Sequence, residues 1–293
     1  MFLQKGDEIL LISTARKISL EEITLATSTL KEWGLKVILG KNIFCENHQF
    51  AGTDTQRAQD LQWALDHPTA KAILCTRGGY GTSRLINLVN FDKFILKPKV
   101  LIGFSDITIL HNEINNRNFS SLHATMPILF ETKTAVSSLK NSLFNSKYII
   151  KTKEHPFNKL GECKAEVIGG NLTLLIHGLG TSSEIETKGK ILFIEEIDEY
   201  LYHVDRMLLQ LKRANKLSKL KGLIIGGFSD MKDNPIPFGK TANEIIKEHC
   251  SEYEFPICFN FPSGHIKNNH ALTFGKKTLL EIKKEEVRLT VLT

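Results

Sequence analysis

The sequence predicts an α/β protein in which an N-terminal parallel-sheet domain is followed by an α+β domain rich in short strands. The first observation is that short apolar runs alternate with segments of helical periodicity through the first half of the 293 residues. The second is a polar stretch near the middle, and the third is a tail with three short strand-like runs. Strands that alternate with helices are typical of a parallel sheet covered on both faces.

Four apolar runs in the first half predict buried strands: Glu8–Ser13, Lys36–Leu39, Ala72–Thr76 and Val100–Phe104. Segments with helical spacing lie between or after them: Ser19–Trp33, Thr53–Leu65, Gly81–Val89 and a helix that begins at Ile107. Ser19, followed three residues later by Glu22, has the pattern of a capping box. Gly34 and the pair His67-Pro68 end the first two helices.

The polar stretch predicts a connector over residues 137–163, between domains that span residues 1–136 and 164–293. Six strands are predicted around and after its end: Ala165–Ile168, Lys190–Ile194, Gly222–Gly226, Ala271–Phe274, Thr278–Ile282 and Val287–Val291. Three helices are predicted in the same half: Leu172–Leu179, Tyr202–Lys212 and Thr241–Cys250. Gly169-Gly170-Asn171 is expected to cap the first of these helices.

Composition and charge argue against several classes of protein. The formal net charge is +6, but Lys and Arg are scattered, so a nucleic-acid partner is not expected. No apolar run reaches the length of a transmembrane helix, and the N-terminus lacks a signal-peptide layout, so no membrane partner is expected. The five cysteines are odd in number and far apart, which favours reduced thiols in the cytoplasm over disulfides or a zinc site.

The stretch V-L-I-G-F-S-D-I-T-I-L, residues 100–110, predicts a strand, a tight turn and a helix. Ser105 in such a turn lies beside backbone N–H groups and the positive end of the helix dipole, as a catalytic nucleophile does. The usual G-x-S-x-G spelling of a nucleophile elbow would need Gly where Ile107 stands. The alternative is that Ser105 or Asp106 is an ordinary N-cap.

A glycine-rich loop, Arg77-Gly78-Gly79-Tyr80-Gly81, follows the predicted strand 72–76. It is neither a dinucleotide fingerprint, whose third Gly would stand where Arg84 is, nor a P-loop. Adjacent glycines allow close backbone approach and free N–H groups, although a simple tight turn explains them as well. Loops at the carboxyl ends of parallel strands carry the sites of such sheets, and this loop and Ser105 are both at such ends.

Two stretches in the second half supply candidate partners for Ser105. Glu195-Glu196 ends a predicted strand, although two acidic residues at a strand end are often only solvated. The segment F-P-S-G-H ends at a histidine, residue 265, on a loop suited to a general base. Spacing alone does not select it over the other histidines considered, which are His270, His203 and His123.

Six motifs in order resemble the LD-carboxypeptidase family (peptidase family S66), which includes the microcin C self-immunity peptidases. They are R-G-G-Y-G (77–81), I-G-F-S-D-I-T (102–108), G-G-N-L (169–172), I-L-F-I-E-E (191–196), Y-x-x-D-R-M-L (202–208) and F-P-S-G-H (261–265). Together they span essentially the whole chain. The resemblance implies a glutamine-amidotransferase-like N-terminal domain and a serine peptidase that requires neither metal nor cofactor and forms a homodimer.

By motif, the resemblance implies a triad of Ser105 as nucleophile, Glu195 as the acidic member and His265 as base. The oxyanion hole that it implies consists of the backbone N–H of Asp106 and one N–H from the glycine loop, from Gly78 or Gly79. The sequence does not decide whether Gly78 or Gly79 donates this second N–H.

The activity that the resemblance implies is removal of the terminal D-Ala from a murein tetrapeptide in cytoplasmic cell-wall recycling. Two alternatives stay open: an immunity-type peptidase that cleaves a peptidyl- or aminoacyl-nucleotide, and a non-catalytic muropeptide-binding protein. A substrate with a terminal carboxylate needs a cation, for which Arg77 is a candidate by position; its alternative is an ordinary ion pair.

The chain departs from the family pattern at two places. The first strand runs into S-T-A-R, residues 13–16, where the family usually has a Pro-containing turn. Asn268-Asn269-His270 differs from the Asp- or Pro-rich spelling common after the base, which puts the substrate contacts near His265 in doubt.

Overall fold

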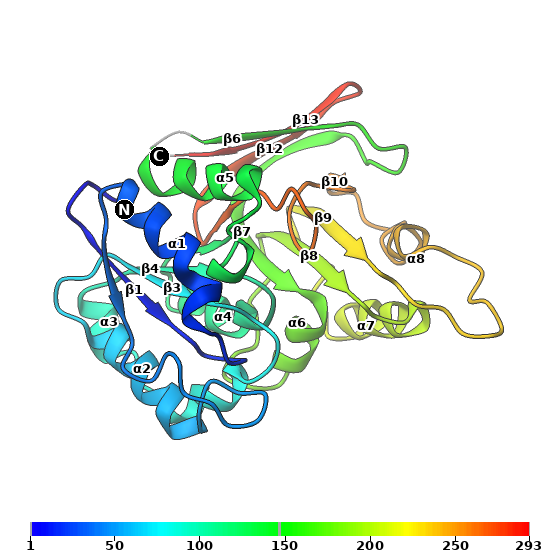
Figure 1. Cartoon of the computed structure of the whole chain (residues 1–293). Coiled ribbons are helices and arrows are strands. Elements are labelled where there is room, and N and C mark those ends of the chain that lie inside the picture. Colours follow the sequence, from blue (N-terminus) through cyan, green and yellow to red (C-terminus); the bar gives the residue numbers. More distant parts are fainter. Residues whose placement is uncertain (1, 146–147, 293) are drawn as a thin grey trace.

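The computed structural model describes residues 2–145 and 148–292, and these residues form two sheets (Figure 1). The first sheet has the strand order β11-β5-β4-β3-β1-β2. Its strands are β1 (Glu8–Ile12), β2 (Lys36–Leu39), β3 (Ala72–Cys75), β4 (Val100–Gly103), β5 (Ser121–His123) and β11 (Leu272–Phe274). Strands β1 to β5 are parallel, and β11 joins β5 antiparallel. The predicted parallel sheet is therefore confirmed.

Helices cover both faces of the first sheet. Successive side chains of a strand point to opposite faces, and in this sheet apolar side chains lie on both of them. Helices α1 (Leu20–Glu32) and α5 (Lys133–Phe144) pack on one face. Helices α2 (Asp54–Asp66), α3 (Asp92–Leu96) and α4 (Thr108–Asn116) pack on the other. This sandwich fixes the carboxyl ends of β3 and β4 on a rigid support.

The second sheet has the strand order β10-β9-β8-β7-β12-β13-β6. Its strands are β6 (Ile149–Lys153), β7 (Gly161–Asn171), β8 (Ile191–Ile197), β9 (Gly222–Ser229), β10 (Ile257–Cys258), β12 (Lys277–Ile282) and β13 (Glu286–Val291). Strands β7 to β10 are parallel, whereas β12, β13 and β6 are antiparallel to their neighbours. Helices α6 (Leu172–Gly178), α7 (Leu201–Arg213) and α8 (Ala242–His249) share one core with the parallel part.

Local capping signals were predicted correctly. Ser19 and Glu22 form a reciprocal capping box at the start of α1. Asn171 is the N-cap of α6, as predicted, and its side chain accepts a backbone hydrogen bond. Thr53 also caps α2 with a capping box, which was not predicted from the sequence. The predicted signals are local in sequence, which is why they could be identified without tertiary information.

Several elements differ from the prediction. The segment expected as a helix over 81–89 is a 3₁₀ helix, η1 (Thr82–Leu88). The expected connector, residues 137–163, holds most of α5 and all of β6. Helix α5 begins before the connector, and its Ser and Asn residues alternate with an apolar stripe: Ala135, Leu139 and Leu143 recur every four residues and are buried.

The order of the strands along the chain does not follow their division between the two sheets. Strand β11 comes from the C-terminal third of the sequence but completes the first sheet, and β6 joins the second sheet from inside the expected connector. Strand β8 continues through Glu195 and Glu196 instead of ending before them. The proposed domain limits at 136 and 164 stay a prediction.

Candidate active site

Ser105 lies in a sharp turn between β4 and α4. The turn is a short 3₁₀ segment, η2 (Ser105–Ile107), and Ser105 has a φ of +65°. This left-handed conformation is strained for a residue with a Cβ and is typical of functional turns. Ser105 is not an N-cap: the capping positions of η2 and α4 are Phe104 and Ile107, and neither makes a side-chain capping bond. The side chain of Ser105 is free to face another partner.

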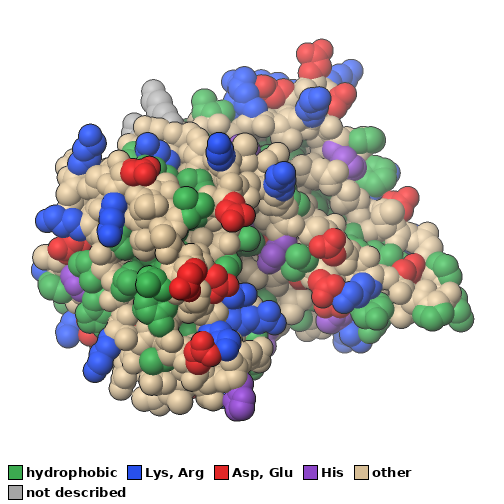
Figure 2. Space-filling view, in the orientation of Figure 1, with side chains coloured by type: hydrophobic (Ala, Val, Ile, Leu, Met, Phe, Trp, Pro, Cys, Tyr) green, Lys and Arg blue, Asp and Glu red, His purple; other side chains and the backbone are tan. Residues whose placement is uncertain are grey.

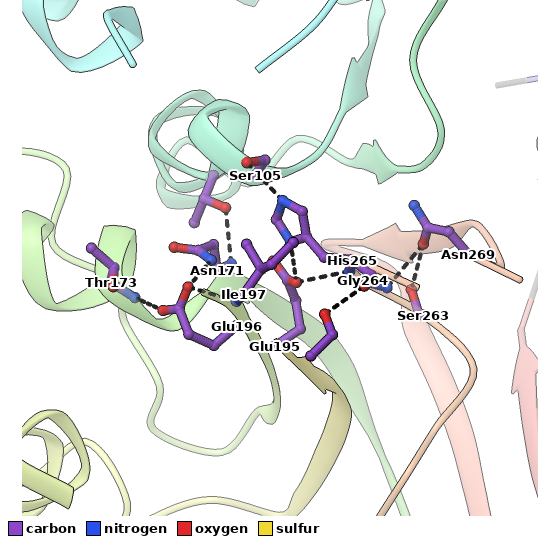
Figure 3. A network of polar contacts seen from close by, with 12 residues as sticks. Ser105, Asn171, Thr173, Glu195, Glu196, Ile197, Ser263, Gly264, His265 and Asn269 are labelled. Atoms are coloured by element: carbon purple, nitrogen blue, oxygen red, sulfur yellow. Dashed lines mark hydrogen bonds and ion pairs between the residues drawn. The ribbon is translucent and has the colours of Figure 1, made fainter. Parts of the chain in front are cut away.

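That partner is His265, which lies between Ser105 and Glu195 (Figure 3). Its Nε2 is 3.0 Å from Oγ of Ser105, and its Nδ1 is 2.6 Å from Oε2 of Glu195. Because a carboxylate only accepts hydrogen bonds, Nδ1–H donates to Glu195, and this leaves Nε2 to accept the hydroxyl proton of Ser105. The three side chains thus form a nucleophile, a base and an orienting acid in sequence.

Glu195 is completely buried in β8, and the backbone N–H of His265 also donates to its Oε2, at 3.1 Å. Gly264, with a φ of +106°, permits this approach, because a Cβ there would lie 2.7 Å from Cβ of Glu195. Asn269 holds the same loop, as its Oδ1 accepts the N–H of Gly264 at 2.9 Å. In the sequence, Asn269 is notable only because the segment 268–270 departs from the family spelling.

Burial lowers the pKa of His265, but the charge and hydrogen bond of Glu195, together with the charge of Glu196, outweigh it. The net effect raises the pKa of the imidazole above its ordinary value of 6.5. The side chain of His265 is 15% exposed, so the ring is largely buried but reachable at one edge. A more basic imidazole is a better acceptor for a hydroxyl proton.

Glu196 points away from the triad and belongs to a second buried network. It accepts hydrogen bonds from Nδ2 of Asn171 at 2.7 Å, from the N–H of Thr173 at 2.8 Å and from the N–H of Ile197 at 3.0 Å. Burial raises the pKa of Glu196, against these hydrogen bonds, and the charge of Glu195 raises it further. The N–H of Asn171 in turn donates to Oγ1 of Thr108 at 3.0 Å, which links β7 to the start of α4.

The glycine loop lies against the nucleophile. A Cβ on Gly78 would lie 3.1 Å from Cβ of Ser105 and 3.5 Å from the backbone nitrogen of Asp106. Gly79, with a φ of +115°, instead faces the side chain of Arg16. Gly78 is thus the member of the loop beside the amide of Asp106.

Asp106 has a buried carboxylate that accepts the backbone N–H of Thr82 at 2.8 Å. This bond ties the start of η1 to the turn that holds the nucleophile. Burial raises the pKa of Asp106, although the hydrogen bonds of Thr82 lower it. The side chain of Asp106 therefore connects the two loops, and only the backbone N–H of this residue is available to a substrate.

Arg77 is engaged elsewhere. Its Nη1 donates to the carbonyl oxygen of Lys17 at 3.2 Å and lies 3.7 Å from a carboxylate oxygen of Glu22. This arrangement matches the ion-pair alternative for the residue. Its role as a substrate clamp stays a prediction without a supporting contact.

The other histidines considered lie in different surroundings. His123 is fully buried in β5, and burial lowers its pKa. His203 pairs with Glu199 at 2.7 Å, and burial lowers the pKa of His270. Among the described residues, only His265 has a ring nitrogen within hydrogen-bond distance of Ser105.

A cavity of about 270 Å³ lies beside His265. Its lining combines apolar and polar side chains: Phe104, Thr125, Leu129, Thr132, Ala135, Ile197, Gly264, His265, Ile266, Lys267 and Asn269. Small clefts with apolar walls and a few polar groups are typical of sites for small ligands.

Within residues 2–145 and 148–292, no three or more His, Cys, Asp or Glu side chains gather as metal ligands, and no helix has the length and apolar character to cross a membrane. Lys and Arg are spread among Asp and Glu over the face seen in Figure 2, with no continuous basic stripe.

Comparison with known proteins gives a consistent result. Residues 9–124 match the LD-carboxypeptidase N-terminal domain, and residues 164–280 match the LD-carboxypeptidase C-terminal domain. A probable murein peptide carboxypeptidase of Bacillus subtilis (strain 168) is 32% identical, over 95% of this chain and 90% of that protein. The murein tetrapeptide carboxypeptidase of Pseudomonas aeruginosa is 29% identical, over 93% of this chain and 92% of that protein.

Solved structures of similar fold include members of the same family. The muramoyltetrapeptide carboxypeptidase from Oxalobacter formigenes has a TM-score of 0.90 and 26% identity, over 98% of this chain and 99% of that one. The microcin C7 self-immunity protein has a TM-score of 0.87 and 20% identity, over 99% of this chain and 97% of that one, which shows a common fold. With both halves of the sequence matched and the fold shared throughout, the chain belongs to the LD-carboxypeptidase family of peptidase hydrolases.

Proposed function

We propose that this chain is a serine LD-carboxypeptidase that removes the terminal D-Ala from a murein tetrapeptide. The observation that carries the proposal is the Ser105–His265–Glu195 chain of contacts, at 3.0 Å and 2.6 Å. The names of the relatives from Bacillus subtilis and Pseudomonas aeruginosa support the substrate class. A non-catalytic muropeptide-binding protein would have no need for a nucleophile held in a strained turn against a base.

In this proposal Ser105 attacks the carbonyl carbon of the bond before D-Ala, and Nε2 of His265 accepts its proton. Glu195 holds the imidazole and stabilises its cation. The N–H groups of Asp106 and of the glycine loop stabilise the oxyanion, each by about 3 kcal/mol in comparable sites. His265 then donates the proton to the leaving amine, and water hydrolyses the acyl-enzyme.

The second candidate is a peptidase for an aminoacyl-nucleotide. The observation that favours it is Tyr80 on the glycine loop: the residue is 47% exposed, and the centroid of its ring lies 5.9 Å from that of Phe50. An exposed aromatic ring on the loop whose Gly78 adjoins Ser105 is suited to stacking against a base. Since both substrates are cleaved at an acyl carbon, the triad serves either reaction.

The direct test measures D-Ala released from purified murein tetrapeptide by the wild type and by Ser105→Ala. We expect release by the wild type and a loss of at least about 10³-fold in the variant. A fluorophosphonate probe should label the wild type and not the variant. Full turnover by Ser105→Ala would refute the triad. If neither protein released D-Ala but the wild type cleaved an aminoacyl-nucleotide, the second candidate would replace the first.

The cytoplasmic setting and the homodimer are parts of the same proposal. All five cysteines are free thiols, which suits a reducing compartment. The homodimer rests on the family resemblance, and light scattering of the purified chain would test it.

A further inference from the structure

The lining of the cavity beside His265 combines apolar side chains with side chains that carry hydrogen-bond donors. Phe104, Leu129, Ile197 and Ile266 are among its apolar lining residues. Its volume of about 270 Å³ is below the range of typical drug-sized sites and suits one small residue. None of the described residues that line it is acidic.

Two side chains at the cavity have unused donors. Lys267 is exposed and makes no hydrogen bond or ion pair with a described residue. Asn269 is 97% buried, and its Oδ1 accepts the N–H of Gly264 at 2.9 Å, whereas the hydroxyl of Ser263 donates to the carbonyl oxygen of His270 at 2.8 Å. Because a backbone N–H can only donate, the bond from Gly264 fixes the orientation of the Asn269 amide, and Nδ2 is left without a partner among the described residues. A buried donor without a partner is costly, and a ligand oxygen would relieve that cost.

The position of the cavity indicates which part of a substrate enters it. The imidazole that takes the proton of Ser105 must later give it to the leaving amine, so the leaving residue lies next to His265. His265 is in the wall of the cavity, as is Phe104, the residue before the nucleophile. The leaving residue of a carboxypeptidase carries a free carboxylate, which a positive charge and N–H donors stabilise.

We propose that this cavity binds the leaving residue and that Lys267 recognises its terminal carboxylate, with the amide of Asn269 as a second donor. The inference rests on the proposed carboxypeptidase function and assigns its substrate clamp. It replaces Arg77, the cation expected from its sequence position, because Arg77 already bonds to Lys17 and Glu22.

The experiment compares two substrates, a tetrapeptide with a free C-terminal carboxylate and the same peptide with a C-terminal carboxamide. Each is assayed with the wild type, Lys267→Met and Lys267→Arg. We expect Lys267→Met to lower kcat/KM for the acid by about 10- to 100-fold, mainly through KM, because a hydrogen bond to a charged group is lost. The carboxamide should be affected less than threefold, and Lys267→Arg should restore most of the loss. Lys284→Met, an exposed lysine in the β12–β13 hairpin, is the matched control.

A binding measurement separates this inference from the proposed function. Calorimetry with the Ser105→Ala variant gives the Kd of the acid and of the carboxamide without turnover. Suppose that the wild type releases no D-Ala, but that the acid binds more tightly than the carboxamide and this difference is lost when Lys267 is replaced by Met. The carboxylate subsite then stands and the proposed activity fails. If Lys267→Met leaves both peptides unchanged, or weakens both equally, the subsite assignment is overturned.

Discussion

Nε2 of His265 lies 3.0 Å from Oγ of Ser105, although the two residues are 160 positions apart in the sequence. Ser105 belongs to the first sheet through β4, whereas His265 is held by Glu195 of β8 in the second. The candidate site therefore exists only where the two sheets meet. Thr108 contributes to that junction, since its Oγ1 accepts the N–H of Asn171.

The backbone of Ser105 stores strain that a substitution can reveal. At a φ of +65°, a residue with a Cβ is disfavoured by about 1–2 kcal/mol relative to its ordinary conformation, and Gly is not. We expect Ser105→Gly to unfold at a higher temperature than Ser105→Ala, although both lack the hydroxyl. Scanning calorimetry of the two variants measures the difference. Equal or reversed melting temperatures would show that the turn is not strained.

The strand, turn and helix around Ser105 could be predicted because their signals are local: an apolar run, a glycine and then helical spacing. The contact with His265 could not, because residue spacing carries no information about which histidine returns to the turn. Only the family motifs singled out His265. The other histidines considered are buried or paired elsewhere, which depends on tertiary packing.

Two further features of the site had no signal in the sequence alone. The bond from Gly264 to Asn269 holds the loop of the base, but its donor is a backbone group that any residue supplies. Lys267 lies beside the cavity, but on the sequence it is one scattered lysine among many. Such roles depend on where the fold of the loop places each residue, which a single sequence does not show.

Gly78 should tolerate no side chain beside the nucleophile. An Ala Cβ there would lie 3.1 Å from Cβ of Ser105 and 3.2 Å from its Oγ, closer than the ordinary 3.5–4.0 Å contact. We expect Gly78→Ala to lower kcat by about 10- to 100-fold, because a small displacement of a reacting group is enough. Gly178→Ala, with a Cβ 3.0 Å from the carbonyl oxygen of Ser183, is a control of similar crowding away from the triad. Equal activity of the two variants would contradict the prediction.

Glu195 should set the pH dependence of the reaction. His265 acts as a base only when neutral, and its raised pKa places the acid limb of kcat/KM above pH 6.5. In Glu195→Gln, burial still lowers the pKa of the imidazole, but the largest opposing charge is gone, so the acid limb should move to lower pH. The rate should also fall, by about 10³-fold or more. A pH–rate profile of both proteins decides this, and an acid limb at the same pH in each would exclude Glu195 as the charge that acts on His265.

Asn171 should contribute to stability through two separate bonds. Its Oδ1 caps α6 by accepting the N–H of Leu174 at 3.2 Å, and its Nδ2 donates to the buried carboxylate of Glu196 at 2.7 Å. Asn171→Ala removes both and should cost about 2–4 kcal/mol, whereas Asn171→Ser keeps a cap and should lose about 1 kcal/mol less. Asn243→Ala, which breaks only an exposed bond to Asn260, should change stability by less than about 0.5 kcal/mol.

Asn171→Asp separates the two contributions by their pH dependence. The new carboxylate can still cap α6, but it faces Glu196, and two like charges raise the pKa of the pair above the values of the unfolded chain. Stability that depends on a proton held by this pair is present at low pH and is lost as the pH rises through the raised pKa. The melting temperature of Asn171→Asp should therefore approach that of the wild type near pH 5 and fall below it near pH 8. A constant difference between the two proteins over this range would mean that Glu196 and residue 171 do not interact electrostatically.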